Sequence, residues 1–396
     1  MDLCEQFYGI SREYFDGKTC GHTAGEIAHQ PKVWRDLCKS LHENKQAIKD
    51  FMSLVTSQGP VRIIMTGAGS SAFAGQAAAD FVARSTGIRC HAIHTTDIVS
   101  SPELCLSAEP TTLLISFARS GNSPESDGAV RYARKIVKNL YEIALVCDGD
   151  SLLAKTTRES DKGLLLVMPE GSCDKGFAMT SSVSCMTLAA FALFNMDALD
   201  EITADINRLA GQVEKDSRRI SEAALTCSGW GAERAWYLGS GAFAGLVQEG
   251  ALKMMELTNG AVVAGYNSAA GFRHGPKTVL NDQCMTIHFI SNDPFTAKYD
   301  LDLLKELNQE KAGNRVIAIH SEAAEGVQAD LCIPYFVQGF GIASDVCASL
   351  QGLLFMQMLS MHTSLGFGIT TDNPSPSGQV NRVVQGVTVY PYEGRK

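Results

Sequence analysis

Ile64-Met-Thr-Gly-Ala-Gly-Ser-Ser-Ala-Phe-Ala-Gly75 and Tyr237-Leu-Gly-Ser-Gly-Ala-Phe-Ala-Gly245 are two similar stretches of this 396-residue chain. Each is an apolar run followed by a Gly-x-Gly turn and a segment of small residues typical of a helix. A repeat of this kind predicts two related α/β units. A strand that ends in glycine and serine before a helix also suits phosphate binding, because the backbone approaches closely and the helix N-terminus offers free N–H groups.

Strand-like and helix-like segments alternate through both halves of the chain. This alternation predicts parallel sheets with helices on both faces. We expect strands at 62–66, 90–94, 112–117, 142–147 and 164–168 in the first half, and at 235–239, 285–291, 316–320 and 331–337 in the second. We expect helices at 71–84, 124–138, 201–225 and 247–257.

The chain is long enough for two domains of ordinary size. We expect a helical N-terminal arm over 1–48, α/β domains over 49–205 and 217–372, and a C-terminal tail over 373–396. The tail contains Pro374 and Pro376, and two prolines this close are incompatible with a helix or a central strand. We expect the tail to pack near the active site.

Composition limits the classes of function. The net charge is −9 and no basic block is present, so we expect no nucleic-acid partner. The first residues lack the basic and apolar runs of a signal peptide, and no apolar run is long enough for a membrane span. The twelve cysteines form no Cys-x-x-Cys pair. We therefore expect a cytoplasmic protein with no metal site and no cofactor.

The glycine-rich turns also fit a loose dinucleotide fingerprint, as Gly67-x-Gly69-x-x-Ala72 and its second copy. A nicotinamide-binding unit needs an acidic residue at the end of the next strand. Asp97 comes too late for this role, and Glu256 follows a helix rather than a strand. We therefore do not expect a nicotinamide enzyme.

Two further polar turns follow strands of the first unit. Ser120, Asn122 and Ser123 come directly before Pro124, which suits the first turn of a helix. Helix capping by Ser123 explains one of these residues but not the cluster. The stretch 171–182 is another polar turn before an apolar helix. Turns at the carboxyl ends of parallel strands are expected to meet in one crevice.

In the second unit, Glu249, Lys253 and Glu256 recur at the spacing of one helix face. A surface ion-pair ladder has the same spacing. The neighbouring residues are apolar, however, and charges on a buried helix are costly unless they are paired or functional. His274 follows in a flexible segment before Gly275-Pro276, where an imidazole can reach a ligand.

Together these motifs resemble the sugar isomerase (SIS) family of phosphosugar-binding domains, in tandem, over about residues 45 to 390. The resemblance implies two flavodoxin-like αβα domains, each with a five-stranded parallel sheet, and a homodimer or higher homo-oligomer with a shared active site. It implies catalytic roles for Glu256, His274 and Lys253, with His274 reaching a neighbouring subunit's site. The implied substrate-binding residues are Gly69, Ser70, Ser71, Arg119, Ser120, Asn122, Ser123, Thr180, Ser181, Glu249 and Gln385.

Within that family, the chain is most similar to the deaminases of amino sugar phosphates. This implies conversion of D-galactosamine 6-phosphate to D-tagatose 6-phosphate and ammonia. The related glucosamine-6-phosphate synthase uses a Schiff-base lysine where this chain has Gln385, and its glutaminase domain needs a cysteine where this chain has Asp2. Two alternatives are a ketose/aldose phosphate isomerase without deamination and a non-catalytic phosphosugar-binding regulator.

Overall fold

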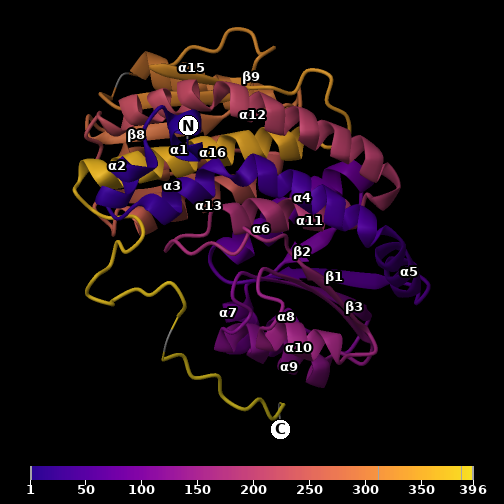
Figure 1. Ribbon diagram of the computed structural model, residues 1–396. Coiled ribbons are helices and arrows are strands. Elements are labelled where there is room, and N and C mark those ends of the chain that lie inside the picture. Colours follow the sequence, from indigo (N-terminus) through magenta and orange to yellow (C-terminus); the bar gives the residue numbers. More distant parts are fainter. Residues whose placement is uncertain (1, 311, 385, 395–396) are drawn as a thin grey trace.

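The computed structural model describes residues 2–310, 312–384 and 386–394 (Figure 1). It contains two five-stranded sheets, in the orders β2-β1-β3-β4-β5 and β10-β9-β8-β6-β7. All of their strand pairs are parallel. Counted from the first strand of each sheet, the two orders are the same. The predicted α/β fold with two five-stranded parallel sheets is therefore confirmed.

The first unit is built on the sheet β1–β5. Its strands are β1 (Val61–Thr66), β2 (Cys90–Ala92), β3 (Thr111–Ala118), β4 (Leu140–Val146) and β5 (Gly163–Val167). Its helices are α6 (Ser70–Thr86), α7 (Thr95–Ser100), α8 (Pro102–Cys105), α9 (Pro124–Ile136), α10 (Leu152–Arg158) and α11 (Ser181–Leu193).

The second unit is built on the sheet β6–β10. Its strands are β6 (Arg234–Leu238), β7 (Val263–Asn267), β8 (Cys284–Phe289), β9 (Arg315–Ser321) and β10 (Leu331–Tyr335). Its helices are α13 (Ala244–Leu257), α14 (Ala269–Phe272), α15 (Thr296–Glu310) and α16 (Ser344–Gly366), and α12 (Leu199–Ser228) precedes it. The sequence analysis did not predict β7. This strand lies at the edge of its sheet, contains Gly265 and leaves Val263 and Tyr266 exposed, so it lacks the apolar run of a buried strand.

Figure 1 shows the two sheets separated by a central layer of helices that includes α4, α6, α11, α12, α13 and α16. Helices α7–α10 cover the outer face of one sheet, and α15 covers the outer face of the other. Helix α11 is buried along its whole length, and α16 along nearly all of it, which matches their apolar sequences. The two units therefore share one core.

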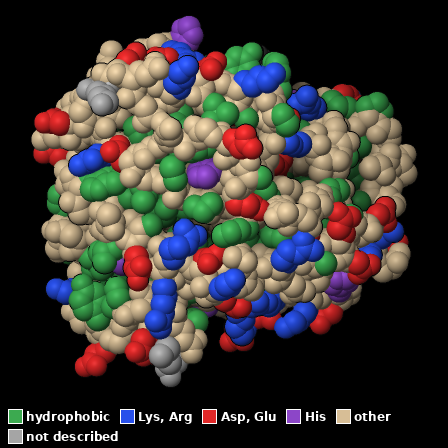
Figure 2. Space-filling model, turned by 90° about the horizontal axis from the view of Figure 1, so that it is seen from above, with side chains coloured by type: hydrophobic (Ala, Val, Ile, Leu, Met, Phe, Trp, Pro, Cys, Tyr) green, Lys and Arg blue, Asp and Glu red, His purple; other side chains and the backbone are tan. Residues whose placement is uncertain are grey.

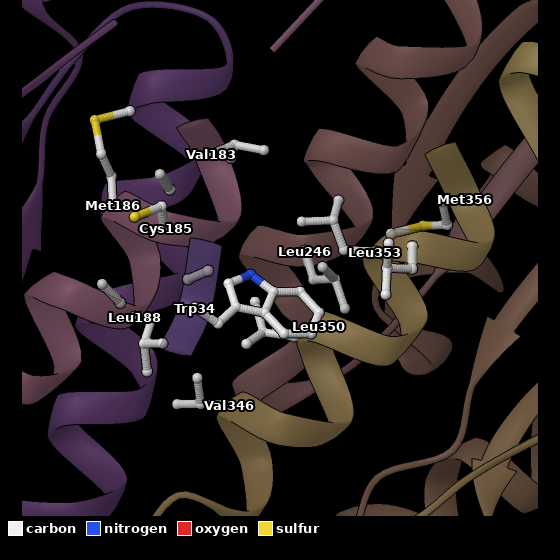
Figure 3. Close-up of a cluster of buried hydrophobic side chains, with 14 of the residues drawn as sticks. Trp34, Val183, Cys185, Met186, Leu188, Leu246, Val346, Leu350, Leu353 and Met356 are labelled. Atoms are coloured by element: carbon white, nitrogen blue, oxygen red, sulfur yellow. The ribbon is translucent and has the colours of Figure 1, made fainter. Parts of the chain in front are cut away.

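The N-terminal helices are part of this core. They are α1 (Leu3–Tyr8), α2 (Arg12–Gly17), α3 (Gly21–Ala28), α4 (Gln30–Glu43) and α5 (Lys45–Thr56). Figure 3 shows the Trp34 indole of α4 among side chains of α11, α13 and α16. Its Nε1–H donates to Ser184 Oγ at 3.0 Å, so the one polar atom of this buried ring is satisfied.

The surface carries charges of both signs. On the face shown in Figure 2, Lys and Arg side chains are interspersed with Asp and Glu side chains. Among the described residues, no single helix is long and apolar enough to cross a membrane, and one bent pair, Ser181–Leu193 with Met196–Ser228, passes by length and composition alone.

Candidate functional site

The turn after β1 requires glycine. Gly69 has φ +56°, in the region that side chains disfavour, and it directly precedes α6. A Cβ atom built on Gly69 would lie 3.8 Å from Leu252 Cδ2 on α13. The first unit's glycine turn therefore lies against a helix of the second unit.

Helices α6 and α13 are in close contact. A Cβ atom on Gly245 would lie only 2.4 Å from the backbone nitrogen of Ala77, so any larger residue would push the helices apart. Gly75 and Gly245 are equivalent in the two repeats. This contact brings α13, which carries Glu249, Lys253 and Glu256, against the Gly69 turn of the first unit.

These three side chains form a buried ionic cluster. The Lys253 side chain is fully buried, with Nζ 3.5 Å from Glu249 Oε1 and paired with Glu256 Oε2. The Glu249 side chain is 3% exposed, whereas that of Glu256 is 26% exposed. The predicted helix face is therefore largely buried rather than a surface ion-pair ladder, and Glu256 is its most accessible member.

Burial shapes the ionisation of this cluster. Desolvation raises the pKa of Glu249 to about 7, although the Lys253 charge opposes the shift. Desolvation alone would lower the pKa of Lys253, but the two carboxylates outweigh it and raise that pKa above its ordinary value. Near neutral pH the cluster thus holds a charged lysine beside a carboxyl group that can exchange a proton.

Arg119 adds a second buried cation. Its guanidinium donates from Nη1 to the Phe177 carbonyl at 3.2 Å and from Nη2 to the Arg382 carbonyl at 2.8 Å. Desolvation, followed by the charge of Arg382, lowers the pKa of Arg119, while Glu256 acts in the opposite direction. No carboxylate among the described residues forms a salt bridge with it, and the hydrogen bonds from its Nη1 and Nη2 go to neutral carbonyl groups.

The loop after β3 holds Ser120, Asn122 and Ser123 at the N-terminus of α9. Gly121 has φ +61°, and a Cβ there would meet Ser151 Oγ at 2.4 Å. Asn122 Oδ1 accepts from the Leu152 N–H at 2.9 Å, so this side chain braces the loop. Ser123 Oγ caps α9 by accepting from the Ser126 N–H at 3.4 Å, and Ser120 Oγ accepts only a long bond from the Asn122 N–H.

Ser70 and Ser71 lie on the first turn of α6, beside the ionic cluster. Ser70 is close enough to Glu249 to lower the pKa of that carboxyl. Ser71 Oγ lies 3.7 Å from Met179 Sδ, which links this turn to the loop after β5. The structure therefore brings together residues of the turn after β1, the loop after β5 and α13.

Thr180 and Ser181 are placed differently. Asp174, which is fully buried, accepts from the backbone N–H groups of Thr180, Ser181 and Ser182 at 2.9–3.0 Å. It also accepts from all three hydroxyl groups. The Asp174 carboxylate thus occupies the N-terminus of α11. The N–H and hydroxyl groups of Thr180 and Ser181, which we expected to bind substrate, donate to this carboxylate instead.

Sequence reasoning missed Asp174 and Glu26. Glu26 accepts from the Gly176 N–H at 3.1 Å, and burial raises the pKa of this carboxyl to about 8. The two carboxylates fix the loop that supplies the Phe177 carbonyl to Arg119. Their isolated positions in irregular or N-terminal sequence gave no signal for this role.

In the second unit, carboxylates of the protein already accept hydrogen bonds from the equivalent turns. Ser240, in its glycine turn, donates to Asp300 Oδ1 at 2.8 Å, and Asp293 Oδ1 accepts from the Thr296 N–H at the start of α15. Ala79, Ala83 and Thr86 occupy the places in the first repeat that Glu249, Lys253 and Glu256 occupy in the second. Among the described residues, the ionic cluster therefore occurs in one of the two units and not in both.

The remaining predicted site residues are His274 and Gln385 of the tail. His274 is exposed, and its side chain forms no hydrogen bond or ion pair with the ionic cluster among the described residues. In the tail, Arg382 Nε donates to the Gly176 carbonyl at 3.1 Å, beside its own contact with Arg119. Gln385 lies outside the described residues.

No group of three or more His, Cys, Asp or Glu side chains in the described ranges is arranged to hold a metal ion.

Comparison with known proteins gives consistent matches. The SIS domain model matches residues 56–196. The chain is 38% identical over 377 residues to D-galactosamine-6-phosphate deaminase AgaS of Escherichia coli, covering 94% of this chain and 96% of that protein. It is 36% identical over 375 residues to the protein of the same name from Shewanella, covering 93% and 92%. The crystal structure of tagatose-6-phosphate ketose/aldose isomerase from Escherichia coli superposes with a TM-score of 0.84 at 34% identity, covering 94% and 97%.

Proposed function

Because the chain belongs to the AgaS family of SIS-domain proteins, we propose that it converts D-galactosamine 6-phosphate to D-tagatose 6-phosphate and ammonia. The observation that carries this proposal is the buried Lys253 between Glu249 and Glu256, beside the Gly69 turn. The ionic cluster supplies proton-transfer groups, and Arg119 with the serine hydroxyls supplies anion-binding groups. The reaction serves the breakdown of amino sugars in the cytoplasm.

The chemistry begins with a proton shift. The open-chain substrate carries an amine on C2, and moving a proton from C2 to C1 leaves an imine at C2. Glu256 takes the proton from C2 and returns it at C1, since it is the most accessible carboxylate of the cluster. Lys253 stabilises the negative charge that develops on the enediol-like intermediate. Water then hydrolyses the imine to a ketone and ammonia, and no lysine Schiff base is needed.

The phosphate group binds at the turns after β1 and β3. Ser71, Ser120 and Ser123 supply hydroxyl donors, and Arg119 supplies the countercharge. Binding energy from this remote group orients C1 and C2 at Glu256. The described part of the C-terminal tail, 373–384 and 386–394, packs near this site, which the contact between Arg382 and Arg119 supports.

The exposed position of His274 suggests a shared site. We propose a homodimer or higher homo-oligomer in which His274 of one subunit opens the sugar ring in the neighbouring subunit. Imidazole suits this step because it exchanges protons near neutral pH. Its exposure, without a hydrogen bond or ion pair to the ionic cluster among the described residues, supports this arrangement.

A second candidate is aldose–ketose isomerisation without deamination. The name of the structural relative, a tagatose-6-phosphate ketose/aldose isomerase, favours it. A panel of substrates separates the two. We expect purified protein to release ammonia from galactosamine 6-phosphate after treatment with EDTA. Interconversion of tagatose 6-phosphate with an aldose phosphate, with no ammonia from any hexosamine 6-phosphate, would favour the isomerase instead.

The proposed role of Ser120 in phosphate binding can be tested separately. Replacing Ser120 with alanine removes one charge-assisted hydrogen bond, worth roughly 1.5–3 kcal/mol. The apparent affinity for the phosphorylated sugar should fall about 10- to 100-fold. The melting temperature should barely change, because among the described residues the Ser120 hydroxyl accepts only one long hydrogen bond. Unchanged affinity with a clearly lower melting temperature would make Ser120 a structural residue only.

A further inference from the structure

The side chain of Arg382 ties the C-terminal tail to the loop after β5. Its Nε donates to the Gly176 carbonyl at 3.1 Å, and its Nη2 donates to the Asp174 carbonyl. One guanidinium group therefore bridges two carbonyl groups of the same loop, which its planar fork of donors allows and a single ammonium group does not reproduce. The backbone of Arg382 is thereby fixed against this loop.

Arg382 also contacts Arg119, through its backbone. Arg119 Nη2 donates to the Arg382 carbonyl at 2.8 Å, and Arg119 Nη1 donates to the Phe177 carbonyl at 3.2 Å. Arg119 is 7% exposed, so its guanidinium has little freedom apart from these contacts. Both acceptors belong to one unit, which consists of the loop after β5 and the tail residue attached to it.

The loop after β5 is itself held by buried carboxylates. Asp174 accepts from the N–H groups at the N-terminus of α11, and Glu26 accepts from the Gly176 N–H at 3.1 Å. A loop fixed in this way offers a rigid base on which Arg382 can hold a neighbouring group. The position of the Arg382 carbonyl therefore depends on the two hydrogen bonds that its own side chain donates.

The end of the tail has a separate attachment on the first unit. Tyr132 Oη donates to the Tyr390 carbonyl, and Tyr392 Oη donates to Glu103 Oε1 at 2.5 Å. Removing the Arg382 side chain therefore leaves the end of the tail attached and disturbs only the segment beside the loop after β5.

Two cations meet beside this loop. Burial, and after it the charge of Arg382, lowers the pKa of Arg119. The hydrogen bonds that the two guanidinium groups donate go to carbonyl groups, which carry no net charge. Like charges repel each other, and a bound anion relieves this repulsion.

We propose that Arg382 is a positioning residue for the phosphate group of the substrate. Its side chain fixes its own carbonyl group beside Arg119, and this contact keeps the Arg119 guanidinium oriented toward the phosphate. The inference rests on the proposed function, in which Arg119 supplies the countercharge. Because Arg382 acts through Arg119, its loss weakens phosphate binding and leaves the proton shift at Glu256 intact.

The test measures binding and turnover separately. Calorimetry gives the Kd for inorganic phosphate, and steady-state kinetics gives KM and kcat for galactosamine 6-phosphate. In Arg382→Ala, both Kd and KM should rise about tenfold, because a misdirected guanidinium loses a charge-assisted hydrogen bond, while kcat should stay within about twofold of wild type. Arg208→Ala is the matched control, since Arg208 donates to the Gly339 carbonyl in the second unit's equivalent loop, and it should keep wild-type values.

Two further variants test whether Arg382 acts through Arg119. The double variant Arg119→Gln/Arg382→Ala should bind phosphate no more weakly than Arg119→Gln alone, because Arg382 then has no guanidinium to position. Arg382→Lys keeps the charge but cannot bridge both carbonyl groups, so it should lose most of the same affinity. Multiplied losses in the double variant, or wild-type affinity in Arg382→Lys, would overturn the positioning role.

The remaining outcomes separate this inference from the proposed function. Wild-type Kd and KM in Arg382→Ala, or a fall in kcat as large as the rise in KM, would overturn the inference. If the alanine variant does not fold, Arg382→Lys carries the same comparison. Absence of ammonia release by the wild-type protein, with phosphate binding weakened as expected in the variants, would overturn the proposed function and leave the role of Arg382 in phosphate binding in place.

Discussion

Replacing Glu256 with glutamine is expected to lower turnover of galactosamine 6-phosphate about 100-fold or more. The amide keeps the size of the side chain but cannot accept a proton from C2, and general base catalysis typically contributes on this scale. Substrate affinity should stay close to wild type, because in the proposed function the phosphate is held at the turns after β1 and β3 and not by Glu256. Steady-state kinetics, together with substrate binding measured by calorimetry, checks both values.

A control variant separates catalysis from ion pairing. Glu214 pairs with Arg35 on the surface, so Glu214→Gln removes an ion pair without touching the site. Its turnover should match that of wild type. Turnover of Glu256→Gln within a few-fold of wild type would mean that Glu256 serves only as a partner for Lys253.

Replacing Lys253 with methionine is expected to abolish turnover and to lower the free energy of unfolding by about 3–5 kcal/mol near neutral pH. The reason is that Lys253 is fully buried, and its loss leaves Glu249 without the charge that favours ionisation. Lys277→Met is the control, since Lys277 pairs with Glu306 at a more accessible position, and its cost should stay below about 1 kcal/mol.

The loss in Lys253→Met should depend on pH. Burial raises the pKa of Glu249 from its ordinary 4.5 to about 7 even with Lys253 present. A carboxyl group whose pKa is raised by folding costs stability as pH rises through that range and costs nothing when protonated in both states. Without Lys253 the cost grows, so denaturant unfolding should show a larger deficit at pH 8 than at pH 5. Equal deficits at both values would contradict this account.

The sequence predicted much of the fold because the repeat preserves local signals. Glycine turns such as that at Gly69 follow buried apolar strands, and both features are visible in the residues themselves. Strand β7 was missed because its burial is partial and a glycine interrupts it. The insertion of Trp34 between the units depends on packing among helices from three parts of the chain, which no local pattern encodes.

The site was predictable only in part. The spacing of Glu249, Lys253 and Glu256 showed that they share a helix face, and the apolar neighbours indicated that this face is buried. The use of the Thr180 and Ser181 donors by Asp174 depends on the path of an irregular loop. The contact of Arg119 with the Arg382 carbonyl joins residues 263 positions apart, and such a pairing has no sequence signal.

The stoichiometry of a single reaction tests the central claim most directly. The claim is that one site shifts a proton between C2 and C1 and then hydrolyses the resulting imine. Purified, EDTA-treated protein with galactosamine 6-phosphate is predicted to form tagatose 6-phosphate and ammonia in equal amounts, each measured by a coupled assay. Formation of a sugar phosphate product with no ammonia, or no reaction with this substrate alongside turnover of an amine-free hexose phosphate, would contradict it.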